Sequence, residues 1–121
     1  MFLDDSEELR EVMPVLLEPA LGVECICLCH VAEFEKRARD VLRAKIAILD
    51  INLGPNVPDG IDAFNWLMDR RFRGKILFLT GHARTNPQVA SAVKKGAEIL
   101  EKPVQPDKLI AAVKRSLDNV P

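Results

Sequence analysis

Short apolar runs alternate along this chain with longer segments of helical periodicity. The run Ile46-Ala47-Ile48-Leu49 contains no polar residue, which is typical of a strand that is covered on both faces of a sheet. Five such strand segments alternate with five helical patterns. This alternation predicts an α/β fold, with a five-stranded parallel sheet, helices on both of its faces and right-handed crossovers.

The expected elements divide the chain without internal repeats or linkers, so we expect residues 1–121 to form a single domain. Ser6 is the expected N-cap of the first helix, and Pro14 is expected to kink that helix or fray its first turns. Residues 52–60 are rich in Gly, Pro and Asn and predict a loop. The expected strands are 1–3, 23–29, 45–50, 75–80 and 98–101. The expected helices are 7–18, 31–43, 61–71, 87–95 with Asn86 as its N-cap, and a last one from Pro106.

The composition excludes several classes of protein. The net charge is -1 and no basic stripe is present, so direct nucleic-acid binding is not expected. No apolar stretch approaches the ~18 residues that span a bilayer, and the first residues do not resemble a signal peptide, so we expect a cytoplasmic protein without membrane insertion. Cys25, Cys27 and Cys29 are odd in number and alternate, which indicates small buried apolar residues rather than a disulfide framework.

Polar residues stand at the carboxyl ends of the expected strands. In an open parallel sheet these ends lie along one edge, where ligands bind. We therefore expect a carboxylate cluster, a hydroxyl and an ammonium to meet there. The residues are the pair Asp4-Asp5, the acid Asp50, the pair Thr80-Gly81 and the pair Lys102-Pro103.

These side chains favour phosphoryl transfer to a carboxylate. Several carboxylates close together repel one another unless a cation neutralises them, and hard oxygen ligands suit Mg²⁺. A carboxylate that also acts as a nucleophile can accept a phosphoryl group as an aspartyl phosphate. The candidates that would neutralise the phosphoryl oxygens are Mg²⁺, Lys102, Thr80 and the amide of Gly81 or Asn52.

This pattern resembles the receiver domain of two-component response regulators, whose fold is flavodoxin-like and CheY-like, over the whole chain. The matching residues are Asp4 and Asp5, Asp50, Thr80 with the small Gly81, and Lys102-Pro103. The separations of 45 residues from Asp5 to Asp50, 30 to Thr80 and 22 to Lys102 agree with the family pattern.

The resemblance implies a role for each site residue. Asp50 would be the phosphoacceptor, Asp5, Asp50 and the main-chain carbonyl of Asn52 would bind Mg²⁺ directly, and Asp4 would act through water. Lys102 would pair with Asp50 and then with the phosphoryl group, and Thr80 would hydrogen-bond a phosphoryl oxygen. Asn52, Gly81 and His82 would flank the phosphoryl group.

The resemblance also implies partners. A histidine kinase or a phosphotransfer protein would donate the phosphoryl group, and an unknown downstream protein would read the phosphorylated state in a phosphorelay. The domain would not be an enzyme for another substrate, because its only chemistry would be Mg²⁺-dependent acceptance and hydrolysis of its own phosphoryl group.

The sequence departs from the family pattern at three places. Only three residues precede the acid pair, so the first strand is short, and the loop after Asp50 is long, with Gly54, Pro55 and Pro58. The switch position three residues before Lys102 holds Ile99, where the family usually has Tyr or Phe. Because isoleucine is smaller and has a restricted χ1, we expect phosphorylation to shift the neighbouring face less, or by another route.

Other interpretations stay open at this point. Asp50 alone suits a turn, Asp4-Asp5 a helix N-terminus, and Lys102 and His82 solvated loops. A pseudo-receiver would keep the fold as an interaction module without phosphorylation. An aspartyl-phosphate hydrolase would need an acid where Asn52 stands, and a flavin-binding protein would need a glycine-rich phosphate loop in place of Asp4-Asp5.

Overall fold

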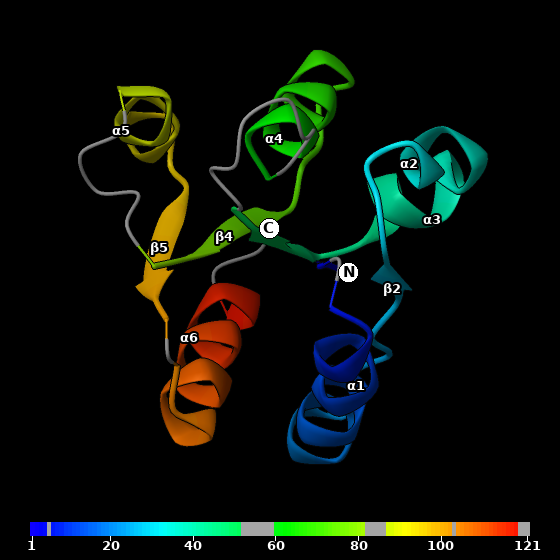
Figure 1. The fold of residues 1–121 in the computed structure, drawn as a ribbon, viewed down its shortest axis with the longest axis vertical. Helices are drawn as coiled ribbons and strands as arrows, with labels where there is room; N and C mark the ends of the chain where they lie inside the picture. Colours follow the sequence, from blue (N-terminus) through cyan, green and yellow to red (C-terminus); the bar gives the residue numbers. More distant parts are fainter. Residues whose placement is uncertain (5, 52–59, 82–86, 103, 119–121) are drawn as a thin grey trace.

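Five parallel strands form one sheet, in the order β2-β1-β3-β4-β5 (Figure 1). The computed structural model describes residues 1–4, 6–51, 60–81, 87–102 and 104–118. β2 lies on one side of β1, and the chain then crosses β1 to form β3, β4 and β5 on the other side. This strand order confirms the predicted flavodoxin-like fold. The strands are β1 (Phe2–Leu3), β2 (Cys27–Leu28), β3 (Ile46–Asp50), β4 (Lys75–Thr80) and β5 (Glu98–Glu101).

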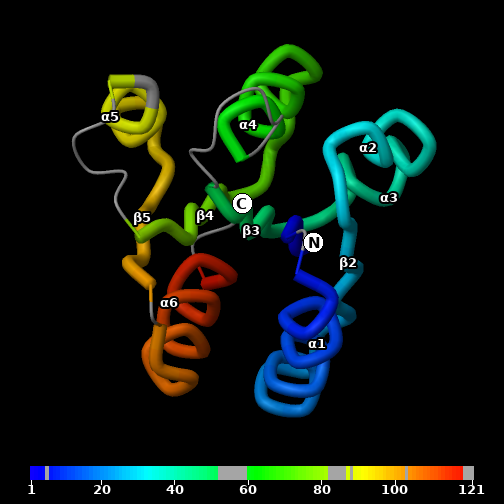
Figure 2. The backbone as a smooth tube through the Cα atoms, viewed as in Figure 1, coloured from blue at the N-terminus to red at the C-terminus, as the bar shows by residue number. Residues whose placement is uncertain are grey.

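Helices cover both faces of the sheet, as the alternation predicts. One face carries α1 (Glu7–Leu21) and α6 (Pro106–Asp118), which lie side by side (Figure 2). The opposite face carries α2 (Glu33–Lys36), α3 (Ala38–Arg43), α4 (Gly60–Asp69) and α5 (Pro87–Lys94). No helix in these described segments is both long and apolar enough to cross a membrane.

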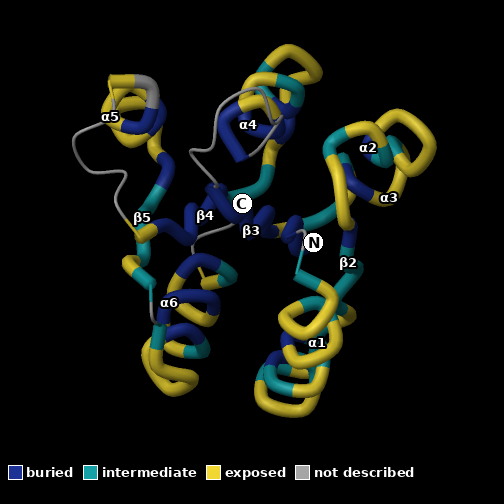
Figure 3. The backbone as a smooth tube through the Cα atoms, in the orientation of Figure 1, coloured by how far each residue is buried: buried dark blue, intermediate teal, exposed yellow. Residues whose placement is uncertain are grey.

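The central strands divide the core into two layers. Along β3, Ala47 and Leu49 pack on the side of α2 to α5, whereas Ile46 and Ile48 pack on the side of α1 and α6. Strand β4 alternates in the same way, and both strands are buried almost throughout (Figure 3). Burial on both faces explains why these strands contain so few polar residues before their last position.

Strand β2 is shorter than the sequence predicts. The expected strand 23–29 contributes only Cys27–Leu28, which pairs with Phe2–Leu3. The backbone N–H of Cys25 donates to the carboxylate of Glu18 in α1, at 2.8 Å, so it is bonded to a helix instead of a strand. The short β1 also offers few ladder partners, so the pairing ends after two residues on each strand.

Helix α1 is longer than predicted and continues through two prolines. It begins after Ser6, whose Oγ accepts from the N–H of Leu9, and it ends at Gly22, which adopts a left-handed conformation with φ 64°. Of the two effects expected of Pro14, fraying of the first turns is therefore wrong, and a kink stays a prediction. The carbonyl of Arg10, which has no helical donor because Pro14 lacks an N–H, accepts a hydrogen bond from Cys27 Sγ at 3.4 Å.

The expected helix 31–43 is divided into α2 and α3 at Arg37, whose φ is -120°. Helical backbone hydrogen bonds between residues four apart nevertheless continue on both sides of Arg37. Arg37 N donates to Glu33 O, and Val41 N donates to Arg37 O. The break is therefore confined to the dihedral angles of one residue. Both segments lie in the one crossover between β2 and β3, so the alternation of strands and helices is kept.

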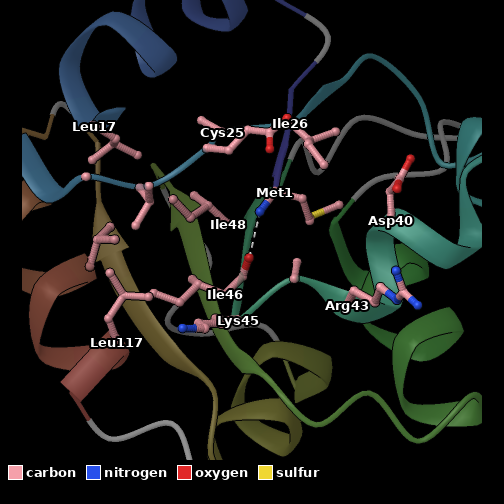
Figure 4. A pocket seen from close by; sticks show the side chains of 15 residues that line it. Met1, Leu17, Cys25, Ile26, Asp40, Arg43, Lys45, Ile46, Ile48 and Leu117 are labelled. Atoms are coloured by element: carbon pink, nitrogen blue, oxygen red, sulfur yellow. Dashed lines mark hydrogen bonds between the residues drawn. The ribbon is translucent and has the colours of Figure 1, made fainter. Parts of the chain in front are cut away.

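A cavity of about 390 Å³ opens at the start of β3 (Figure 4). Its wall includes Met1, Leu17, Cys25 and Ile46, and the amino group of Met1 donates to the carbonyl of Ile46 at 2.7 Å. The cavity lies where residues 23–26 leave the sheet. Lys45 and Ile46, at the start of β3, line the cavity, whereas Asp50 is the last residue of that strand. The cavity is therefore separate from the carboxyl ends of the strands, where the polar residues stand.

Candidate functional site

The carboxyl ends of β1, β3, β4 and β5 bring together the polar residues that the sequence singled out. Asp50 is the last residue of β3 and Thr80 the last of β4, while Asp4 and Lys102 each directly follow a strand. In the parallel register Asp50 pairs with Leu79, and Thr80 pairs with Glu101. The expected meeting of polar groups at one sheet edge is confirmed for Asp4, Asp50, Thr80 and Lys102.

Backbone hydrogen bonds extend the sheet by one residue at this edge and hold the functional side chains in place. Ile51 N donates to Leu79 O at 2.9 Å, and Lys102 N donates to Thr80 O at 2.8 Å. Asp4 N donates to Leu28 O at 3.1 Å. The side chains therefore leave a rigid scaffold, which is more favourable for a defined site than a loop alone.

Lys102 forms an ion pair with Asp50 across this edge. Its Nζ donates a hydrogen bond to Asp50 Oδ1 and lies 4.0 Å from Asp4 Oδ2. The side chains of Asp50 and Asp4 are 8% and 2% exposed, whereas that of Lys102 is 35% exposed. The partly exposed ammonium of Lys102 therefore lies near two buried carboxylates, those of Asp4 and Asp50. Among these three described side chains, two negative charges face one positive charge.

This excess charge makes the edge attractive to a cation. Two carboxylates in a poorly hydrated site repel one another, and their attraction to one ammonium only partly offsets the loss of hydration. Within the described segments, no three acidic, histidine or cysteine side chains converge as a metal-binding group. The described donors are the two carboxylates of Asp4 and Asp50, which are hard oxygen ligands.

Thr80 and Gly81 lie at the end of β4 beside this charged group. Thr80 is 1% exposed, whereas Gly81 is exposed and a Cβ built on it meets no described atom within 4 Å. Among the described residues, nothing therefore fills the space beside Gly81, directly after a buried hydroxyl residue.

Asp5, Asn52 and His82, together with Pro103 and the loop 52–59, lie outside the described residues. Their predicted roles in binding a metal or flanking a phosphoryl group therefore stay predictions. The expected helix 87–95 is confirmed as α5, which begins at Pro87 and ends at Lys94, one residue earlier than expected.

Two residues that support the site were not singled out from the sequence. Gly60, the first residue of α4, lies so close to β3 that a Cβ on it would be 2.7 Å from the carbonyl oxygen of Asp50. Arg10 in α1 donates from Nη1 to the carbonyl oxygen of Asp4 at 2.8 Å. A glycine at the end of a Pro-Asp loop gives some signal for Gly60, whereas nothing in the sequence distinguishes Arg10 from a surface arginine.

Ile99, which the family pattern places at the switch position, lies within β5 and pairs with Phe78 of β4. It is partly buried and packs against the core layer on the side of α2 to α5. An isoleucine in this place contributes to packing between the sheet and that layer. The structure contains no aromatic ring at this position that could change its exposure.

The cysteines are only partly as predicted. All three are free, Cys25 and Cys27 are partly buried with their Sγ atoms 4.0 Å apart, and Cys29 is exposed, so the expected burial of Cys29 is wrong. Burial raises the pKa of Cys25 to about 12 and raises the pKa of Cys27 as well. Both thiols are therefore protonated at neutral pH, as in apolar packing.

Comparisons with known proteins agree with this geometry. The family model of the response regulator receiver domain matches residues 1–114. The tetrathionate response regulatory protein TtrR from Salmonella typhimurium is 32% identical over 116 residues, which are 95% of this chain and 54% of that protein. The chain thus spans about half the length of this curated relative.

Solved structures show the same fold. A CheY-like receiver domain protein from Methanospirillum hungatei superposes with a TM-score of 0.78 at 22% identity, covering 97% of this chain and 90% of that one. A response regulator receiver domain protein from Clostridium thermocellum gives a TM-score of 0.80 at 24% identity, covering 97% of this chain and 91% of that one. At these identities the likeness establishes the fold alone.

Proposed function

The chain belongs to the family of response regulator receiver domains of two-component systems, and we propose that it is a switch phosphorylated on Asp50. The observation that carries the proposal is the ion pair between Asp50 and Lys102, which stands beside Asp4 at the end of β3. A buried carboxylate with an adjacent ammonium provides both a nucleophile and a positive charge for the incoming phosphoryl group.

In the proposed reaction one carboxylate oxygen of Asp50 attacks the phosphorus atom of the donor. A phosphorus–oxygen bond forms to Asp50 as the bond to the leaving group breaks, and the leaving group takes that electron pair. Lys102 then transfers its ion pair from the carboxylate to the phosphoryl oxygens. Thr80, which is buried at the end of β4, donates its hydroxyl to one of these oxygens.

The donor set fits Mg²⁺, because two hard carboxylates stand at the edge with one ammonium between them. Asp50 would hold the ion directly and Asp4 would hold it through water, and Asp5 and the carbonyl of Asn52 are the further direct ligands that the family pattern implies. When bound, Mg²⁺ supplies neutralisation of the phosphoryl charge.

Receiver domains of two-component systems work with kinases and downstream effectors. We assign a histidine kinase or a phosphotransfer protein as the donor, and a downstream protein as the receiver of the signal. Because Ile99 replaces the usual aromatic residue, we expect phosphorylation to move the face formed by α5, β5 and α6 less than in the family, or by another route. Amide exchange on that face with and without beryllofluoride tests this, and a full family-like response would contradict it.

The phosphorylation itself is tested by incubation with acetyl phosphate and Mg²⁺, followed by intact mass measurement. We expect an adduct of one phosphoryl group, which is lost when Mg²⁺ is chelated and in Asp50→Asn. The matched control is Asp40→Asn, an exposed acid of α3 that pairs with Arg37, and it should leave the adduct unchanged. No adduct, together with no Mg²⁺ binding, would instead favour the pseudo-receiver that is not phosphorylated.

A further inference from the structure

The guanidinium of Arg10 holds the main chain at the acid pair. Its Nη1 donates to the carbonyl oxygen of Asp4 at 2.8 Å. Two other polar groups of Asp4 are also engaged, since its N–H donates to Leu28 O at 3.1 Å and its Oδ1 accepts from Ser6 N at 2.9 Å. The hydrogen bond from Arg10 therefore fixes the orientation of the main-chain carbonyl of Asp4.

The main chain of Arg10 is in turn hydrogen-bonded to a residue of β2. Because Pro14 has no N–H, the carbonyl of Arg10 lacks its helical donor, and Cys27 Sγ donates to this carbonyl at 3.4 Å. Cys27 in turn pairs with Phe2 in the ladder between β1 and β2. The main chain of Arg10 is thus held by β2, while its side chain reaches the end of β1.

Two roles for Arg10 predict opposite effects on a cation at this edge. If Arg10 acted mainly as a positive charge near Asp4, it would repel a divalent cation, and its removal would tighten cation binding. If it acts by orienting the main chain at Asp4, its removal would weaken cation binding, as removal of groups that orient metal ligands does. The sign of the change therefore distinguishes the two roles.

We propose that Arg10 is a positioning residue for Asp4, and that the hydrogen bond from Cys27 holds Arg10 in position. The direct hydrogen bond to the carbonyl, and the anchoring of the same residue through its own carbonyl, favour orientation over a simple charge effect. The inference rests on the proposed function, because the cation that it concerns is the Mg²⁺ of the phosphorylation site.

The test compares Arg10→Met, which keeps most of the aliphatic stem, with Arg10→Lys, which keeps a charged donor. In metal-free protein, the loss of the hydrogen bond in Arg10→Met should move the ¹³C carbonyl resonance of Asp4, and Arg10→Lys should restore part of that change. In a Mg²⁺ titration followed by backbone amide resonances, Arg10→Met should bind about tenfold more weakly, and Arg10→Lys should recover part of the loss.

The control is Arg115→Met, which removes an exposed arginine that pairs with Glu98 of β5, and it should leave Mg²⁺ affinity unchanged. If Arg10→Met does not fold, Cys27→Ala and Cys27→Ser replace it. Alanine removes the donor to Arg10 and should weaken Mg²⁺ binding, whereas serine keeps a donor and should weaken it less.

Each outcome separates the two proposals. If the wild-type protein binds no Mg²⁺, the proposed function fails. If the wild type binds Mg²⁺ but Arg10→Met binds it equally or more tightly, the positioning role of Arg10 is overturned and the proposed function stands.

Discussion

Replacing Lys102 by Met should destabilise the metal-free protein, because it leaves two buried carboxylates without their shared cation. Breaking a fully buried ion pair by removing one partner costs about 3–5 kcal/mol, and an exposed pair contributes roughly 0.2–1 kcal/mol. The Lys102 side chain is 35% exposed and that of Asp50 is 8% exposed, so the pair lies between these limits. We expect a loss of about 2 kcal/mol in the free energy of unfolding.

The complementary substitution Asp50→Asn should increase the free energy of unfolding of the metal-free protein or leave it almost unchanged. It removes one of the two carboxylates, and Lys102 still lies 4.0 Å from the remaining one, Asp4 Oδ2. In the double variant Asp50→Asn with Lys102→Met, loss of the lysine should cost only about half as much as in the wild type, since one carboxylate is left instead of two.

Urea unfolding in a buffer with a chelator measures these free energies of unfolding. The control is Arg37→Met, which breaks an exposed ion pair with Asp40. It should change the free energy of unfolding by less than about 1 kcal/mol. Addition of Mg²⁺ should restore stability to Lys102→Met more than it stabilises the wild type, because the cation occupies the more negative site. If Lys102→Met were as stable as the wild type without Mg²⁺, the electrostatic account of the site would be refuted.

The remaining predictions concern packing and protonation. Gly60→Ala should cost about 1–3 kcal/mol, because its Cβ would stand 2.7 Å from Asp50 O, whereas Gly81→Ala should change the free energy of unfolding by less than about 0.5 kcal/mol; equal effects in urea unfolding would contradict this. Burial raises the pKa of Cys25 from 9.0 to about 12, so the folded state retains a proton that the unfolded chain releases. The resulting stabilisation should be complete below pH 9 and disappear as the pH approaches 12, and a Cys25→Ala variant with an unchanged alkaline slope would refute it. Glu35→Gln should cost about 0.5–1.5 kcal/mol, because Glu35 accepts from both Trp66 and Arg70 and joins α2 to α4, and unchanged thermal unfolding would count against that joint role.

The central part of the fold could be predicted from the sequence because burial on both faces leaves a strong pattern. Strand β4 was predicted with its observed bounds, and β3 to within one residue, since these strands contain apolar residues up to their last position. Asp50 and Thr80 then stand out as polar residues at the ends of such runs. Their meeting follows from the parallel topology alone, which is why this part of the site could be predicted.

Strand β2, at one edge of the sheet, was less predictable, because its pairing depends on partners that are remote in sequence, whereas β5 at the other edge has its predicted bounds, Glu98–Glu101. The alternating residues 23–29 suit a strand, yet only Cys27–Leu28 pairs, since β1 is short and Glu18 captures the N–H of Cys25. The same limit applies to Gly60 and Arg10, whose importance lies in contacts with main-chain oxygens of β3 and β1. A contact of this kind leaves no periodic signal in the sequence.

Pro14 shows how a local departure from helix propensity connects with the site. A proline inside a helix removes a hydrogen bond and costs about 3 kcal/mol in an isolated helix. Here the carbonyl that it leaves open, that of Arg10, accepts from Cys27 of β2, so the lost helical bond is replaced by a contact between α1 and the sheet. Because the side chain of the same arginine reaches Asp4, the proline contributes to fixing α1 at the edge where the acid pair stands. A residue that is unfavourable for the helix alone thus becomes favourable for the placement of the helix against the site.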